Sequence, residues 1–122
     1  MSYPKRHYAK GVRKERGAAS RFKRSVRMFK AARNHLVESH ALNRGVAPPY
    51  FIECLLYNVL NSHFKERLDD TFAEVVDWLT VTDLRGFKSQ NGVVDLFGSS
   101  KDQWSVLDAQ VFVRGLANLW DG

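Results

Sequence analysis

A chain of 122 residues, 44% of them hydrophobic, is long enough to bury one core and is not disordered throughout. Its lone cysteine, Cys54, excludes a disulfide scaffold or a cysteine-based zinc site. The net charge is +6, but the basic N-terminus lacks the apolar core of a signal peptide, and no apolar stretch reaches the about 18 residues of a membrane span. We therefore expect a cytoplasmic protein without a membrane partner.

The basic charge is concentrated at the N-terminal end. Residues 1–33 hold twelve Lys and Arg against one acid, a charge of +11, whereas residues 34–122 hold seven bases against twelve acids, a charge of −5. This asymmetry indicates a polyanionic partner, and a solvated basic tail on an acidic globule is an equally good interpretation. Residues 1–19 contain Pro4, Gly11 and Gly17 and lack apolar periodicity, so we expect an irregular basic arm.

Four main helices are expected after the arm, which predicts an all-α single domain over residues 20–122. The first helix begins near Ser20, a suitable N-cap, and ends between Glu38 and Asn43. The second, over about 49–60, is apolar nearly all round and belongs in the centre of the core, with Pro49 at its first position. The apolar stripe of the first helix consists of Phe22, Val26, Phe29, Leu36 and Val37.

The third helix is expected over about 65–79, followed by an irregular stretch over 80–103. Within this stretch, Val93–Phe97 fits a short strand or a helical turn equally well. The last helix begins at Ser105, with Asp108 at capping-box-like spacing. We expect its buried side to consist of Val106, Ala109, Val113, Leu116 and Trp120.

Three bases share one face of the first helix. At 100° per residue, Lys23, Arg27 and Lys30 fall within a sector of about 40°, with Asn34 between them. The apolar stripe adjoins this sector, so Lys30 can rest its stem on the core and direct its ammonium towards a phosphate. Taken alone, the pattern favours a simpler interpretation, in which the bases only solvate one helix face.

Arg33 falls in the middle of the apolar stripe, where an unpaired guanidinium is very costly. The second helix offers one acid within its apolar run, Glu53. We predict a structural Arg33–Glu53 salt bridge between the two helices; the alternative is that Arg33 reaches a ligand. The spacing of the four histidines predicts no metal site, and no P-loop is present. We interpret the Asp69–Asp70 pair as an exposed acidic face of the third helix and not as a catalytic pair.

A family resemblance covers nearly the whole chain. The run Arg21–Asn34 resembles the helix that opens the C-terminal domain of CD-NTases, the bacterial cGAS/DncV-like nucleotidyltransferases related to 2′-5′-oligoadenylate synthetases. Residues Tyr3–Val12 resemble the segment that leaves the catalytic core. Ala47–Val59 resembles the buried helix, and Leu96–Trp120 the closing loop and helix. The first-helix and Pro-Pro-Tyr segments are specific in combination.

The resemblance implies the C-terminal half of an enzyme that makes cyclic oligonucleotides for antiphage signalling. A polymerase-β-like core, in cis or in trans, would supply three carboxylates and two Mg²⁺ ions for attack on an NTP. This chain would supply the other wall of the cleft, with Lys30, Lys23, Arg27 and Asn34 on the triphosphate. We expect no catalytic residue and no cofactor in the chain itself, and residues 1–19 would lead out of the core.

Two other classes of function remain open from the sequence. The basic arm and the Lys23/Arg27/Lys30 face also suit a stand-alone module that binds nucleic acid. A helical interaction protein that docks a catalytic partner is the third interpretation.

Overall fold

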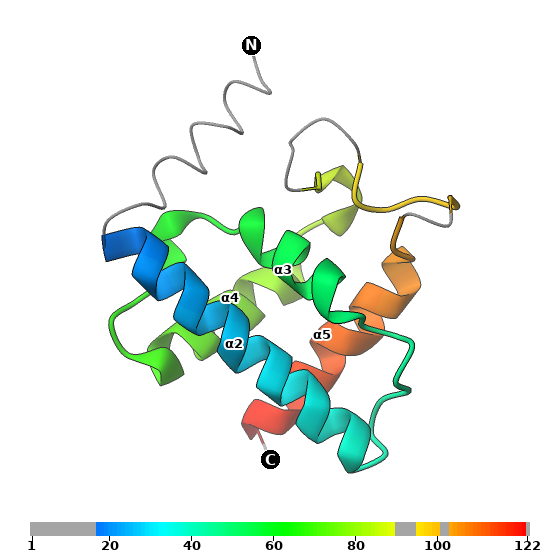
Figure 1. Ribbon diagram of the computed structural model, residues 1–122, viewed down its shortest axis with the longest axis horizontal. Coiled ribbons are helices and arrows are strands. Elements are labelled where there is room, and N and C mark those ends of the chain that lie inside the picture. Colours follow the sequence, from blue (N-terminus) through cyan, green and yellow to red (C-terminus); the bar gives the residue numbers. More distant parts are fainter. Residues whose placement is uncertain (1–16, 90–94, 101–102, 122) are drawn as a thin grey trace.

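Four α-helices carry the fold of the computed structural model (Figure 1). The structure describes residues 17–89, 95–100 and 103–121, and only the backbone of 17–19 and 121. Two 3-10 turns, η1 (Asn61–His63) and η2 (Leu84–Gly86), and two isolated bridges complete the described part, which contains no strand. The all-α prediction is confirmed. The helices are α2 (Gly17–Glu38), α3 (Pro49–Tyr57), α4 (Leu68–Val81) and α5 (Val106–Asp121).

Local sequence signals set several helix ends. Pro49 occupies the first turn of α3, as predicted. The hydroxyl of Ser105 accepts the backbone N–H of Asp108 at 3.3 Å, which is the N-cap interaction predicted for the last helix. The first helix begins three residues earlier than expected, because Ala18 and Ala19 are strong helix formers. Residues 1–16 of the expected arm lie outside the described residues. So do residues 93 and 94 of the segment Val93–Phe97, for which a strand and a helical turn were both expected as alternatives.

Two helix ends differ from the prediction because side chains bind the backbone there. The third helix begins at Leu68 instead of Lys65, since the Lys65 N–H donates to Thr71 Oγ1 at 2.6 Å. The second helix ends at Tyr57 instead of Leu60. Asn58 is the first residue after this helix, and its Nδ2 donates to the carbonyl oxygens of Cys54 and Lys88, at 2.9 and 2.8 Å. Both bonds give the backbone an alternative to a further helical turn.

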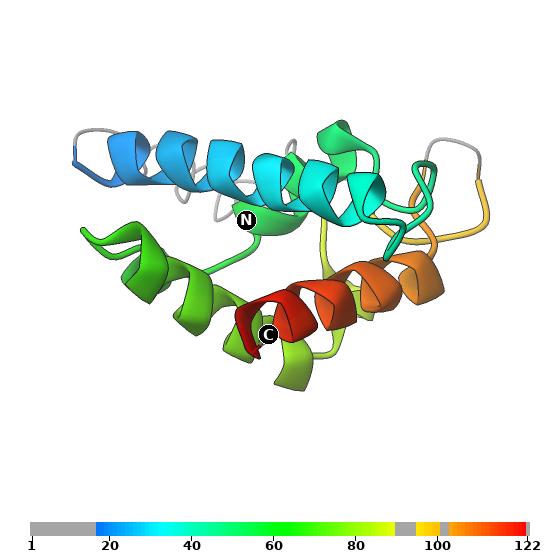
Figure 2. The ribbon, with the colours of Figure 1, turned by 90° about the horizontal axis from the view of Figure 1, so that it is seen from below.

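The helices pack in two layers. Figure 2 shows α2 above α4 and α5, and Figure 1 shows α3 beside α2. Phe29 of α2 stacks on Phe72 of α4, with 5.1 Å between ring centroids. The prediction that α3 is central is confirmed, since its buried residues include Ile52, Leu55 and Leu56, each with no exposed surface. No helix among the described residues is long and apolar enough to cross a membrane.

The buried side of α5 differs from the prediction at two positions. Trp120, expected in the core, is 50% exposed and only tilts its ring against Phe72 at 5.6 Å. Phe112, which the sequence analysis left out, has no exposed surface and with Leu116 fills the centre of the molecule. The spacing of four between these two residues places them on one side of α5, whereas Trp120 lies near the end of the last helix.

Replacement of Phe112 by alanine should therefore destabilise the fold strongly. We expect the free energy of unfolding to fall by about 3–5 kcal/mol, because the substitution removes a fully buried ring and leaves a cavity. Leu107→Ala is the matched control on the same helix, since Leu107 is 72% exposed and should change stability by less than about 0.5 kcal/mol. Urea denaturation followed by circular dichroism measures both; equal losses would contradict the assigned core.

Candidate functional site

The basic sector of α2 lies on the side of the helix away from the core. Lys23 and Arg27 are exposed, and Lys30 is half-buried, at the boundary predicted from the helical wheel. The neighbouring positions Val26 and Phe29 are buried against the rest of the molecule. The basic sector therefore presents two solvent-exposed cationic side chains, Lys23 and Arg27, and a third, Lys30, whose aliphatic part rests on the apolar edge.

Lys30 is held at this edge by a carboxylate from the next helix. Its Nζ lies 3.5 Å from Glu53 Oε1, and the two side chains are 34% and 38% exposed. A pair so accessible to water contributes only about 0–1 kcal/mol to stability. The pair places the Lys30 ammonium at the junction of α2 and α3, where it stays accessible to water.

Arg33 has different partners from the predicted Glu53. Its guanidinium donates to the carbonyl oxygens of Ala47 at 3.1 Å and Arg44 at 2.7 Å. A third bond, of 2.8 Å, goes to Asn34 Oδ1. The two carbonyl acceptors lie in the turn that precedes α3, and Arg33 faces this turn from the last part of α2. The salt bridge that Glu53 forms is with Lys30. The need for a partner was inferred correctly, but backbone carbonyls meet it.

These bonds also determine what Asn34 offers to a ligand. Its side chain is exposed, and its oxygen accepts from Arg33 at 2.8 Å. The amide nitrogen keeps two hydrogens, so the side chain is oriented as a donor. Asn34 thus extends the basic sector by a neutral hydrogen-bond donor at the C-terminal end of α2.

Trp104 holds the same turn from the other side. Its indole Nε1 donates to the Val46 carbonyl at 2.8 Å, and its ring stacks on Phe51 with 5.6 Å between centroids. The sequence analysis missed this role, although a buried indole N–H generally requires an acceptor. Arg33 and Trp104 together fix the turn over 44–47, and with it the position at which α3 begins.

Arg24 is a second anchoring residue that sequence reasoning missed. Its Nη2 donates to the Glu66 carbonyl at 2.6 Å and approaches the Lys65 carbonyl at 3.5 Å. These contacts tie the first half of α2 to the segment before α4. No sequence signal identifies such a contact, since every residue carries a carbonyl.

The acidic side chains on and before α4 form exposed ion pairs. Lys65 Nζ lies 3.3 Å from Glu74 Oε1, and this hydrogen bond holds the pKa of the Glu74 carboxyl below its ordinary value. Arg67 Nη2 lies 2.7 Å from Asp69 Oδ2, and this hydrogen bond likewise holds the pKa of the Asp69 carboxyl below its ordinary value. No three His, Cys, Asp or Glu side chains are grouped for a metal ion in the described ranges. The described residues therefore do not fit the Mg²⁺ ions that the resemblance implies for the complete enzyme.

Comparison with known proteins identifies the relatives of this arrangement. Residues 9–121 match the family model of the cGAS/DncV-like nucleotidyltransferase C-terminal helical domain. The cyclic UMP-AMP synthase of Rhodothermus marinus is 45% identical over 122 residues, which are 100% of this chain and 42% of that protein. The cyclic nucleotide synthase CdnE01 of Staphylococcus haemolyticus is 34% identical over 99% of this chain and 41% of its own length.

A solved structure shows the same fold. The Rhodothermus marinus CdnE c-UMP-AMP synthase, determined with Apcpp and Upnpp, matches with a TM-score of 0.85 and 45% identity. The match covers 99% of this chain and 41% of that one. The chain thus spans about two fifths of the length of these relatives.

The Arg33 contacts predict that lysine cannot replace arginine at this position. Arg33→Lys keeps the charge but loses the planar fork that reaches two carbonyls at once, so we expect the free energy of unfolding to fall by about 1–3 kcal/mol. Arg44→Lys is the control, because the Arg44 side chain is exposed and only its carbonyl is used. Thermal or urea unfolding of both variants measures the difference, and an unaltered Arg33→Lys protein would contradict the clamp.

Proposed function

We propose that this chain, which belongs to the family of cGAS/DncV-like nucleotidyltransferase C-terminal helical domains, forms the helical wall of the nucleotide-binding cleft in a cyclic-oligonucleotide synthase. The names of its relatives support this reaction class, since they are cyclic nucleotide synthases. The structure of the Rhodothermus marinus relative with two nucleotide analogues supports nucleoside triphosphates as ligands.

The observation that carries the proposal is the placement of Lys30. A half-buried ammonium at the edge between two helices, oriented by Glu53 but only weakly paired, is well prepared to exchange its partner. A triphosphate carries several negative charges and makes stronger charge-assisted hydrogen bonds than a single half-exposed carboxylate. Nucleotide binding would then move the Lys30 ammonium from Glu53 to a phosphate oxygen with little loss of stability.

The rest of the sector supplies weaker contacts. Arg27 and Lys23 lie on the same face of α2, about one and two turns before Lys30 respectively, and both are exposed. They add positive potential along the path of a polyphosphate. The oriented amide of Asn34 can donate to a phosphate, ribose or base oxygen. This chain would therefore bind and orient the nucleotide.

The metal chemistry is assigned to the partner domain. When bound to the complete enzyme, Mg²⁺ would stabilise the attacking and leaving oxygens of phosphoryl transfer. A polymerase-β-like core, joined to this chain or assembled with it, is the proposed source of the ligands. The described part of this chain holds the substrate against that core.

A hybrid enzyme tests the proposal directly. The chain would replace the corresponding C-terminal two fifths of the Rhodothermus marinus cyclic UMP-AMP synthase, to which it is 45% identical along its full length. We expect the hybrid to convert labelled ATP and UTP into a cyclic dinucleotide, measured by chromatography. A folded hybrid that binds neither nucleotide would contradict the proposed function.

Within that hybrid, Lys30→Ala separates triphosphate binding from fold. We expect kcat/KM to fall by about tenfold to a hundredfold through loss of a charge-assisted contact, with the melting temperature unchanged. Lys65→Ala is the matched control, because Lys65 also forms a half-exposed ion pair, 3.3 Å from Glu74. Equal activities of the two variants would remove Lys30 from the site.

The competing function, nucleic-acid binding, predicts a different result with the unfused chain. Titration with duplex DNA over a salt series would show an affinity that falls steeply with ionic strength. We expect ATP to compete for the basic sector, so that Lys30→Ala weakens ATP binding more than DNA binding. The reverse order would favour the nucleic-acid module.

A further inference from the structure

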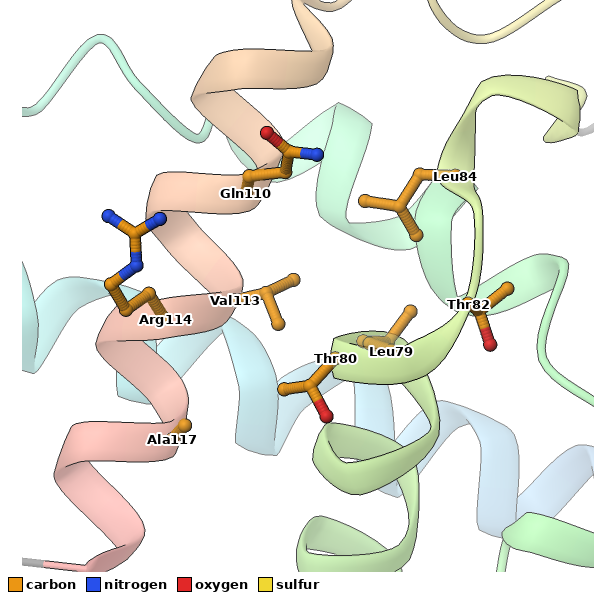
Figure 3. Close-up of a pocket in the computed structure, with 8 residues that line it drawn as sticks. All are labelled: Leu79, Thr80, Thr82, Leu84, Gln110, Val113, Arg114 and Ala117. Carbon is orange, nitrogen blue, oxygen red and sulfur yellow. The ribbon is translucent and has the colours of Figure 1, made fainter.

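A pocket lies between the end of α4 and the middle of α5 (Figure 3). Its volume is about 370 Å³, at the lower end of the range for small-molecule sites. Leu79, Leu84 and Val113 form an apolar floor, and each of these side chains is at most 4% exposed. A floor of this kind suits the body of a molecule with one or two rings.

The α5 side of the pocket offers donors and a positive charge. Gln110 and Arg114 lie on the same stripe of α5 as Val113, and both are exposed. The structure gives neither side chain a hydrogen-bond or ion-pair partner among the residues it describes. Arg24 and Arg33, by contrast, bind backbone carbonyls. Arg114 therefore has donor capacity that no described neighbour uses.

The α4 side of the pocket offers only acceptors. Thr80 Oγ1 donates to the Asp77 carbonyl at 2.7 Å, and Thr82 Oγ1 donates to the Trp78 carbonyl at 2.6 Å. Since each hydroxyl has one hydrogen, both oxygens can only accept from a molecule in the pocket. The two walls are thus chemically opposite: cationic and donating on α5, and accepting on α4.

The pocket is separate from the basic sector of α2. In Figure 3 the ribbons of α2 and α3 pass behind the lining residues, and Figure 2 shows α4 and α5 as the layer opposite α2. Lys30 and Glu53 lie at the junction of α2 and α3, so a molecule in this pocket does not touch them.

We propose that the α4–α5 pocket is a second ligand site, which binds a small organic anion. The anionic group, a carboxylate, pairs with the Arg114 guanidinium beside the Gln110 amide. The ring body rests on Leu79, Leu84 and Val113. A hydroxyl or amino group at the far end of the ligand donates to Thr80 or Thr82. This site is independent of the proposed triphosphate contacts.

The test uses 6-hydroxy-2-naphthoate, which carries a carboxylate and a hydroxyl at opposite ends of a flat apolar body. Titration of the full chain, followed by amide ¹H–¹⁵N shifts, should perturb residues 79–84 and 110–117 with a dissociation constant below about 1 mM. The neutral amide of the same compound should bind about tenfold more weakly, because the charge-assisted pair is lost.

Variants assign the contacts. Arg114→Gln should reduce the affinity for the naphthoate to that for the neutral amide. Arg44 is exposed and lies outside the pocket, so Arg44→Gln should leave the affinity for the naphthoate unchanged. Replacement of both Thr80 and Thr82 by valine should remove the preference for 6-hydroxy-2-naphthoate over 2-naphthoate. Lys30→Ala should leave naphthoate binding intact, so that failure of the triphosphate proposal and failure of this one are distinguishable.

Three outcomes would overturn the proposal. The first is no saturable shift at about 5 mM probe, which corresponds to less than about 3 kcal/mol of binding free energy. The second is a set of shifts centred on α2. The third is equal affinity of the charged and neutral probes, which would mean that the pocket only takes up apolar surface.

Discussion

The bonds from Arg33 to the turn over 44–47 determine the geometry on which the candidate site depends. Helix α2 ends at Glu38, and the chain reverses before α3 begins at Pro49. The guanidinium of Arg33 fixes this reversal through the carbonyls of Arg44 and Ala47, and Trp104 fixes it again through Val46. The register of α3 against α2 follows from that turn, and so does the meeting of Glu53 with Lys30. One planar cation in the apolar stripe thus orients a second cation at its edge.

The sequence predicted the features that are encoded locally or by periodicity. Pro49 and Ser105 specify helix starts by their own chemistry, and the stripe from Phe22 to Leu36 identifies the buried side of α2. The Arg33 partner was mispredicted because an acid is visible in a sequence, whereas the carbonyls that Arg33 actually binds belong to every residue. Helical spacing places Trp120 on the same side of α5 as Leu116, but spacing alone does not predict that the Trp120 side chain, near the end of the helix, is 50% exposed.

The triphosphate contacts proposed for Lys30, Lys23, Arg27 and Asn34 are supported by family membership together with the placement of these residues on α2. The α4–α5 pocket had no sequence signal of its own. Its lining comes from the end of one helix, the segment after it and the middle of another, so only the folded chain brings them together. Charge follows the same division. The basic residues concentrate before position 34, and Arg114 is one of only seven bases in the remainder of the chain, whose net charge is −5.

The bond from Trp104 to Val46 joins residues 58 positions apart in the sequence. Phe112 and Leu116, which fill the centre of the core, come later still. During synthesis on the ribosome, α2 and α3 therefore emerge well before the residue that locks their connection. The core can be completed only after α5 has been made, because Phe112 and Leu116 lie at its centre and α5 packs against α2 and α4.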